Sequence, residues 1–133
     1  MEVREYAIYN EDEILRLYAS VGWTAYTDQP DMLKKGFANS LLTLAAYENN
    51  RLLGIIRAVG DGCTIVFIQD ILVYPEYQRN GIGSRLIQSV LERFQHVRQI
   101  HLAADNTPES MAFYKSQGFS EMSEAGCSMF TRI

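Results

Sequence analysis

The sequence has little cysteine, and the placement of that cysteine excludes two kinds of stabilised fold. Only 2 cysteines occur in 133 residues, and Cys63 and Cys127 lie far apart, with no Cys-x-x-Cys spacing and no nearby histidine pair. A disulfide framework and a zinc site are both unexpected, because each needs several such side chains at short spacing. Two free thiols in a reducing cytoplasm are the simpler interpretation, and we expect no metal cofactor.

Long apolar runs and concentrated positive charge are also missing. No apolar stretch is long enough to span a membrane, and the charged start Met1–Glu5 lacks the apolar core of a signal peptide. The formal net charge is −4 without a basic stripe, which argues against a nucleic-acid partner. The remaining composition, 47% hydrophobic and 21% charged, is typical of a globular protein. We therefore expect one cytoplasmic domain over residues 1–133, without membrane contact.

A buried-strand pattern followed by a polar turn and a helix stands out in the middle of the chain. The stretch Thr64–Tyr74 is rich in β-branched and aromatic residues, which predicts a mostly buried strand. Pro75 ends this strand because proline supplies no ladder N–H. Apolar residues then recur at helical spacing from Ile82 to Phe94. Between the two lies Gln78–Gly83, whose glycines allow a tight turn and close approach of the backbone to a ligand.

The start of such a helix is suited to bind phosphate. Its first N–H groups have no intrahelical partner and carry the positive end of the helix dipole, and Arg79 and Arg85 add positive charge. A Walker loop is excluded because Gly83-Ser84-Arg85 lacks the lysine, and a dinucleotide fingerprint is excluded because Leu86 replaces its third glycine or alanine. The alternative is a glycine turn that merely starts a helix.

The pattern that fits is Gln/Arg-x-x-Gly-x-Gly/Ala, which Gln78–Gly83 matches at every fixed position. With Val73–Tyr77 in front, the stretch resembles the acyl-CoA-binding motif of the GCN5-related N-acetyltransferases, the GNAT family. The resemblance implies acetyl-CoA as cofactor, with the pantetheine pairing like an extra strand and an N–H of Leu72 or Val73 on the thioester carbonyl. The cofactor-binding residues that it implies here are Ile71, Leu72, Val73, Gln78, Arg79, Asn80, Gly81, Ile82, Gly83, Ser84 and Arg85.

The whole chain predicts the element order βααβββαβαββ. The expected strands are Val3–Ile8, Leu41–Tyr47, Arg51–Val59, Thr64–Tyr74, Gln99–Ala104, Phe119–Ser123 and Cys127–Ile133. Four helices are expected. Asn10 caps the first, Pro30 lies in the first turn of the second, the third follows the glycine turn, and Thr107 or Asn106 caps the fourth, with Trp23–Gln29 as a loop between the first two. This is an α/β (α+β) fold with a mixed sheet of about six to seven strands and helices on both faces. It is also the element order of the GNAT family, so the resemblance covers nearly the whole chain.

A second stretch, Asp105–Phe119, resembles the other signature of that family, an asparagine followed by an aromatic–tyrosine pair and Gly-Phe. The resemblance implies that Tyr114 protonates the departing thiolate and that Asn106 and Tyr114 contact the cofactor. The sequence departs from the family pattern in spacing, because Asn106 and Tyr114 are one residue further apart than usual. A core aromatic residue with a satisfied hydroxyl is the alternative role for Tyr114.

Asp70 is the only carboxylate inside the motif strand, where an ionisable group is costly unless it is paired or used. A lysine-like amine has a pKa of about 10.4, so an acceptor amine needs a base to reach its neutral form. Polyamine acetyltransferases have a similar strand with a glutamate–aspartate pair, and Gln69-Asp70 stands in that place here. Asp70 is therefore a candidate base, directly or through water, or an anchor for a cationic substrate. Its third possible role is structural, either pairing with Arg57 or capping a backbone bend.

The loop after the first helix carries two aromatic residues and a carboxylate, which suit an amine through cation–π contact and charge. The GNAT resemblance places the acceptor-binding loop there, and it implies the substrate-binding residues Trp23, Tyr26, Asp28, Gln69 and Asp70. Packing of Trp23 on the core is the alternative. The loop Trp23–Asp28 and the stretch Arg57–Val73 also faintly resemble the plant and cyanobacterial arylalkylamine-type branch of the family.

The resemblance as a whole implies an acetyl-CoA-dependent N-acetyltransferase that uses a primary amine of a small molecule, aromatic or polyamine-like, by direct attack on the thioester. Peptide or protein N-termini are the second acceptor class. Two other classes of protein remain as alternatives to an enzyme. One is a CoA-sensing module without turnover, and the other is an unrelated α/β domain. A homodimer is a reasonable expectation, because the late strands would be exposed.

Overall fold

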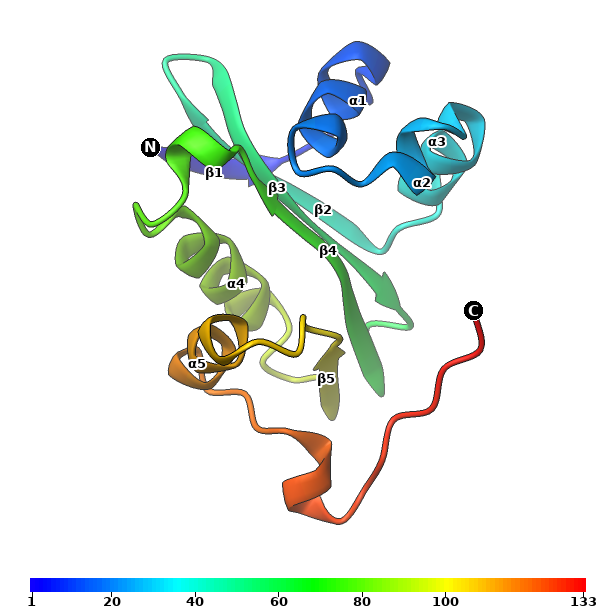
Figure 1. Ribbon diagram of the computed structural model, residues 1–133, viewed down its shortest axis with the longest axis vertical. Helices are drawn as coiled ribbons and strands as arrows, with labels where there is room; N and C mark the ends of the chain where they lie inside the picture. Colours follow the sequence, from blue (N-terminus) through cyan, green and yellow to red (C-terminus); the bar gives the residue numbers. More distant parts are fainter. The chain divides into compact units, whose positions relative to one another are not determined.

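A five-stranded mixed sheet is the frame of the computed structural model, which describes residues 1–133 (Figure 1). Its strands lie side by side in chain order: β1 (Glu2–Glu5), β2 (Leu42–Glu48), β3 (Arg51–Gly60), β4 (Ile65–Val73) and β5 (Gln99–Leu102). Neighbouring strands are antiparallel from β1 to β4, and β5 is parallel to β4. The mixed sheet and its antiparallel meander are confirmed.

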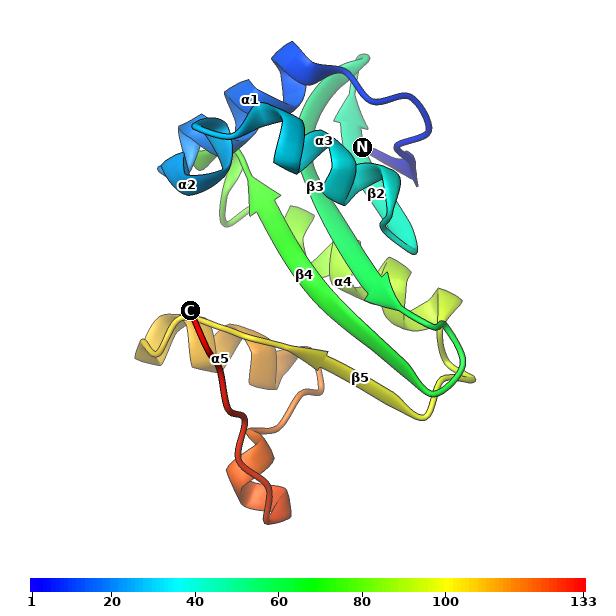
Figure 2. The ribbon, with the colours of Figure 1, turned by 90° about the vertical axis from the view of Figure 1, so that its right-hand side faces the viewer.

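Helices cover both faces of this sheet (Figures 1 and 2). The helices α1 (Glu11–Ser20), α2 (Thr24–Thr27) and α3 (Pro30–Ala38) lie on one face, and α4 (Ile82–Arg93) lies on the other. Asn10 begins α1 by accepting the N–H of Glu13 at 3.1 Å on its side chain, as its capping preference predicts. The stretch expected as a loop contains the single turn α2, because the Trp23 carbonyl accepts the N–H groups of Tyr26 and Thr27.

Each face of the sheet has its own apolar core. On the α1 side the buried residues are Ile14, Leu17, Tyr18, Leu33, Ala45, Leu52, Ile55 and Leu72. On α4 the buried residues are Ile82, Leu86, Ile87 and Val90, which match the helical spacing seen in the sequence. A smaller cluster of Ala58, Val66 and Val97 has Ile100 of β5 packed against it. No helix is long and apolar enough to cross a membrane.

The chain divides into two compact units, Met1–Ala103 with the whole sheet and Ala104–Ile133. The second unit holds α5 (Pro108–Ser116) and the 3₁₀ turn η2 (Met122–Ala125). Thr107 caps α5 by accepting the N–H of Ser110 at 3.2 Å, as expected for one of the two candidate caps. The single domain over 1–133 stays a prediction.

The prediction of two late strands is wrong, and the sheet has five strands instead of the six to seven expected. The first, Phe119–Ser123, runs into η2, whose 3₁₀ turn ends at Gly126 with φ +80°, so the backbone leaves the extended conformation. The second, Cys127–Ile133, is exposed at every residue and belongs to no ladder. Alternating apolar residues favour a strand, but a strand also needs a neighbour for its N–H and C=O groups.

Candidate active site

A bulge in β4 divides this strand into a paired half and an open half. The register between β3 and β4 shifts from Arg57↔Asp70 to Ala58↔Ile68, which leaves Gln69 as the extra residue. A bulge of this kind bends the strand and increases its local twist. On the other side, β5 pairs with β4 only from Ile65 to Ile68. Residues 69–73 of β4 therefore form an edge with no strand on the β5 side.

Backbone groups of Ile71 and Val73 face this open edge. The N–H of Tyr74 donates to the Leu53 carbonyl of the neighbouring strand at 3.0 Å. Hydrogen-bonded and non-hydrogen-bonded pairs alternate along an antiparallel ladder, so the groups of Leu72 point to β3 and those of Ile71 and Val73 point away. The Val73 carbonyl agrees with this direction, because it accepts the Gln78 side-chain amide at 3.1 Å instead of a β3 group. Of the two N–H candidates for a thioester carbonyl, Val73 is the one on the open edge.

The glycine turn connects the open edge to the start of α4. After the 3₁₀ turn η1 (Pro75–Tyr77), Arg79 and Gly81 adopt left-handed backbone conformations, with φ +67° and +80°. The Asn80 side-chain amide donates to the Tyr77 carbonyl at 3.2 Å and holds the turn closed. Gly81 caps α4 without a side-chain acceptor, and the first turn of the helix has no acidic residue. The positive end of the helix dipole is therefore available to an anion.

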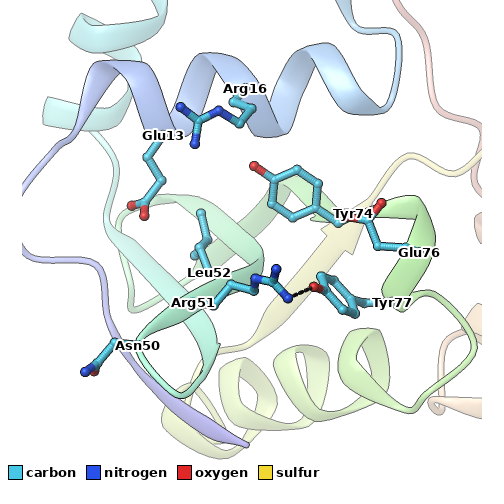
Figure 3. Close-up of a pocket in the computed structure, with 8 residues that line it drawn as sticks. All are labelled: Glu13, Arg16, Asn50, Arg51, Leu52, Tyr74, Glu76 and Tyr77. Carbon is cyan, nitrogen blue, oxygen red and sulfur yellow. Dashed lines mark hydrogen bonds between the residues drawn. The ribbon is translucent and has the colours of Figure 1, made fainter.

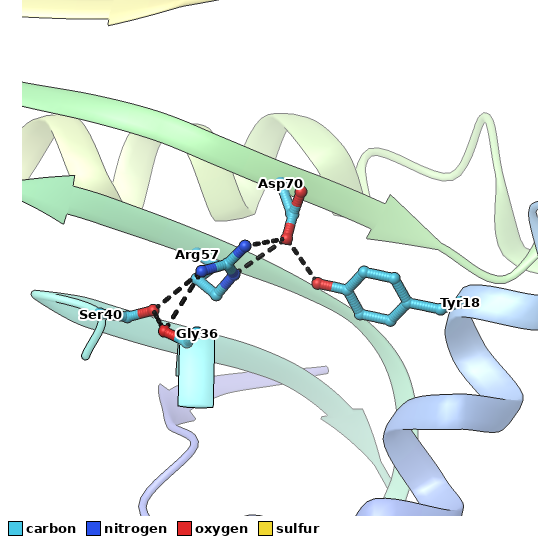
Figure 4. A network of polar contacts seen from close by, with 5 residues as sticks. All are labelled: Tyr18, Gly36, Ser40, Arg57 and Asp70. Atoms are coloured by element: carbon cyan, nitrogen blue, oxygen red, sulfur yellow. Dashed lines mark hydrogen bonds and ion pairs between the residues drawn. The ribbon is translucent and has the colours of Figure 1, made fainter. Parts of the chain in front are cut away.

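Asp70 lies in a buried polar network on the α1 face (Figure 4). Its carboxylate is 2% exposed, and its Oδ2 atom accepts the Tyr18 hydroxyl at 2.6 Å and the Arg57 Nε at 2.9 Å. Arg57 also places Nη2 at 2.7 Å from the same oxygen, while its Nη1 donates to the Gly36 carbonyl and the Ser40 hydroxyl at 3.3 and 3.2 Å. All three contacts to the carboxylate use one oxygen, and in Figure 4 the second oxygen points away from Arg57 and Tyr18.

Electrostatics fix the protonation states of Tyr18 and Arg57 in this network. Burial, followed by the charge of Asp70 and its hydrogen bond, raises the pKa of the Tyr18 phenol well above its usual range. Burial lowers the pKa of the Arg57 guanidinium, but Asp70 and then Tyr18 outweigh burial, so the net pKa is raised. Tyr18 therefore stays a neutral donor and Arg57 stays charged. The pairing of Asp70 with Arg57, one of its three candidate roles, is present, and the roles of base and anchor stay predictions.

Trp23 and Tyr26 of the expected acceptor loop pack on Tyr18. The Tyr18 ring centroid lies 6.0 Å from that of Trp23 and 5.5 Å from that of Tyr26, with edge-on geometry. Trp23 is 37% exposed, so one part of it faces solvent while another part contacts the network. Asp28 is exposed at the end of α2, and Gln69 is exposed on the bulge. Tyr18 thus joins the acceptor loop to Asp70, a contact across 52 positions that no local sequence signal indicates.

Tyr114 and Asn106, the two residues that the signature in Asp105–Phe119 implies, lie in the second unit. Tyr114 is half-buried, with its ring centroid 5.1 Å from that of Phe113 and 6.3 Å from that of Phe119. Burial, followed by the charge of Asp105, raises the pKa of this phenol, so it is protonated at neutral pH and able to donate. Asn106 is exposed directly before the cap of α5.

A pocket of about 330 Å³ opens beside the glycine turn (Figure 3). Its lining residues come from α1, the β2–β3 turn, β3 and the segment after β4: Glu13, Arg16, Asn50, Arg51, Leu52, Tyr74, Glu76 and Tyr77. Arg51 donates to the Tyr77 hydroxyl across one wall. The residues expected to bind the acceptor do not line this pocket.

Comparison with known families identifies the class of protein to which this fold and the glycine turn belong. The acetyltransferase (GNAT) domain model matches residues 9–130, and the chain belongs to this family. A GNAT-family acetyltransferase structure from Streptococcus pneumoniae has a TM-score of 0.89 and 36% identity, with 99% of this chain and 96% of that one covered. A coenzyme A complex of an aminoglycoside 6′-N-acetyltransferase shares the fold, with a TM-score of 0.70, 19% identity and 89% and 84% coverage.

The curated relatives are longer. An uncharacterised N-acetyltransferase of Prochlorococcus marinus, described as ycf52-like, is 33% identical over 113 residues, which are 80% of this chain and 61% of the relative. A chloroplastic GCN5-related N-acetyltransferase of Arabidopsis thaliana is 26% identical over 110 residues, which are 83% of this chain and 56% of the relative. The chain thus spans about three-fifths of these relatives. The expected GNAT family and fold class are confirmed, and so is acetyl-CoA as the family's cofactor.

Proposed function

We propose that the chain transfers the acetyl group of acetyl-CoA to a primary amine of a small molecule. The observation that carries the proposal is the open edge of β4 over residues 69–73. This edge leads through the glycine turn to the start of α4, where Gly81 provides no side-chain cap. An extended ligand with amide groups fits the edge, and a pyrophosphate fits the helix start. Acetyl-CoA has both parts, and when bound it supplies the activated thioester.

The residues that would hold this cofactor divide into three groups. The backbone groups of Ile71 and Val73 face the open edge and would pair with the pantetheine, with the Val73 N–H directed at the thioester carbonyl. Leu72 would contribute only through packing, because its side chain is 2% exposed in the core. Pyrophosphate contacts would come from the turn and the first helical turn, namely Gln78, Arg79, Asn80, Gly81, Ile82, Gly83, Ser84 and Arg85. Asn106 is the proposed contact from the second unit.

An amine acceptor would bind against Trp23 and Tyr26. Both rings contact Tyr18 next to the bulge, and the exposed part of Trp23 offers an aromatic face to a cation or to an aromatic amine. Asp28 and a net charge of −4 favour a positively charged acceptor over an acidic one. This supports aromatic amines and polyamines as the substrate class, with peptide N-termini as the competing class.

Two side chains would transfer protons during the reaction, one as the acceptor and one as the donor. The Oδ2 atom of Asp70 is occupied by Tyr18 and Arg57, so the Oδ1 atom is the one left to accept the amine proton, directly or through a water. The Tyr114 phenol is protonated at neutral pH and would donate to the departing thiolate. Arg57 and Tyr18 hold the Asp70 carboxylate in place and so preserve its direction.

A thiol-release assay with acetyl-CoA tests the proposal. The acceptor panel contains aromatic amines, polyamines, aminoglycosides and peptides, and calorimetry measures CoA binding on the same protein. We expect CoA binding and saturable thiol release with an aromatic amine or polyamine. Binding without release for any acceptor would instead establish a CoA-sensing module, and release only with peptides would establish the competing acceptor class. No CoA binding at all would refute the proposed cofactor site.

A further inference from the structure

The pocket beside the glycine turn lies within the sheet unit and uses none of the residues proposed above for the cofactor or the acceptor. Its volume of about 330 Å³ is within the range of small-molecule sites. Leu52, which is 4% exposed, gives the wall an apolar part, and the rings of Tyr74 and Tyr77 lie edge-on with their centroids 6.4 Å apart. The Tyr74 N–H donates to the Leu53 carbonyl at 3.0 Å, so the pocket is built on the rigid end of the sheet.

Four polar side chains from three parts of the chain point into this pocket (Figure 3). Glu13 and Arg16 come from α1, Arg51 is the first residue of β3, and Tyr74 directly follows β4. In Figure 3 their charged or hydroxyl ends are directed toward the same space. Burial raises the pKa of the Tyr74 phenol, the charge of Arg16 opposes this effect, and the charge of Glu13 adds to it. Charges of both signs therefore act on one hydroxyl in the wall of the pocket.

The charged groups of this wall have hydrogen-bonding capacity that the chain does not use. Arg16 makes no hydrogen bond and no ion pair with another residue. Tyr6 donates to the Oε1 atom of Glu13 at 2.8 Å, which leaves Oε2 to accept a further donor. Arg51 donates to the Tyr77 hydroxyl through Nη1, which leaves Nε and Nη2 as donors. The pocket thus offers two cationic donors and one anionic acceptor to a ligand.

We propose that this pocket binds a free α-amino acid with an aromatic side chain, its carboxylate on Arg16 and Arg51 and its ammonium on Glu13. Glu13 and Arg16 are three residues apart on one helix, so their opposite charges are neighbours, as are the two charges of an α-amino acid. The lining contains two arginines and two glutamates, a balance that favours a ligand with both charges over a polyamine or a polyanion. The aromatic ring of the ligand would pack on Leu52 and against Tyr74.

Titration calorimetry with three matched ligands tests the two charges separately. L-Phenylalanine carries both charges, 2-phenylethylamine carries only the ammonium, and 3-phenylpropanoate carries only the carboxylate. We expect L-phenylalanine to bind at least about tenfold more tightly than either analogue, because each charge adds charge-assisted hydrogen bonds. No binding of L-phenylalanine to the folded wild-type protein would overturn the proposal.

Two variants assign each charge of the ligand to its partner. Arg16→Gln should weaken L-phenylalanine and 3-phenylpropanoate at least about tenfold and leave 2-phenylethylamine unchanged. Glu13→Gln should weaken L-phenylalanine and 2-phenylethylamine and leave 3-phenylpropanoate unchanged. Asp12→Asn is the matched control on α1, since Asp12 is exposed and outside the pocket, and this variant should bind all three ligands as wild type does. Melting curves show that each variant is folded, and an equal loss for all three ligands in both pocket variants would overturn the proposal.

The same titration in the presence of coenzyme A separates this site from the proposed cofactor site. The dissociation constant of L-phenylalanine should stay unchanged as the CoA concentration rises, because the pocket shares no residue with that site. A dissociation constant that rises in proportion to the CoA concentration would place both ligands in one site and overturn the proposal. If CoA does not bind at all, the proposed function fails, while the result for L-phenylalanine alone still decides this inference.

Discussion

The buried carboxylate of Asp70 has two distinct oxygens, one held by Tyr18 and Arg57 and one directed away from them. Asp70→Asn keeps the shape and removes the charge. If Oδ1 takes the amine proton, kcat should fall about 10²- to 10⁴-fold near pH 6 and recover as rising pH supplies neutral amine. A pH–rate series from pH 6 to 9 measures this.

A melting curve on the same variant separates catalysis from structure. Removing one partner of a buried ion pair costs about 3–5 kcal/mol, so Asp70→Asn should also unfold at a lower temperature. Tyr18→Phe is the matched control, because it removes one donor and leaves the pair with Arg57 intact. Kinetics that match wild type across the whole pH range would leave Asp70 with only its structural role.

Tyr114 differs from Phe by a single hydroxyl, which makes it a clean test of the proposed acid. Tyr114→Phe should lower kcat about 10²-fold or more with little change in CoA affinity, because the proton is needed only as the thiolate leaves. The direction of the raised pKa can also be tested: this phenol keeps its proton to a higher pH than an ordinary tyrosine does. No alkaline loss of activity from this group is therefore expected at a pH where an ordinary tyrosine is still protonated. Unchanged turnover would assign Tyr114 to packing alone.

At the scale of elements, the strand, turn and helix around Gly81 are predictable from sequence because each depends on local chemistry. β-branched residues fill β4, Pro75 ends it, and a left-handed position selects Gly81. The bulge at Gln69 is not predictable in this way, since it exists only through the register that β3 imposes. The same limit explains the missing late strands and the unforeseen contact of Tyr18 with Asp70.

The open half of β4 makes a prediction that depends on backbone direction alone. Val73→Pro removes the N–H that faces the open edge and leaves the ladder with β3, so the variant should fold. Loss of a hydrogen-bond donor to the reacting carbonyl should lower kcat about 10²- to 10³-fold. Val73→Ile is the control that keeps the N–H. Wild-type kcat in a folded Val73→Pro protein would place the carbonyl contact elsewhere.

At the scale of the whole molecule, two compact units share one family match over residues 9–130. The sheet unit contains the open edge, the glycine turn and the aromatic loop, and the second unit contains Tyr114 and Asn106. The net charge of −4 favours the proposed cationic acceptor and disfavours an anion. The proposed pyrophosphate site therefore depends on local groups of the turn and of α4. The central claim is therefore that this turn binds coenzyme A.

Calorimetric titration of CoA into wild type, Gly83→Val and Glu92→Val tests that claim most directly. Gly83 lies in the first turn of α4. A valine side chain there would occupy the space that we propose for the pyrophosphate. Glu92 is exposed near the other end of the same helix, so Glu92→Val controls for valine in a helix. We predict that Gly83→Val binds CoA at least about tenfold more weakly than the other two while all three melt cooperatively. Equal affinity in all three folded proteins would contradict the account.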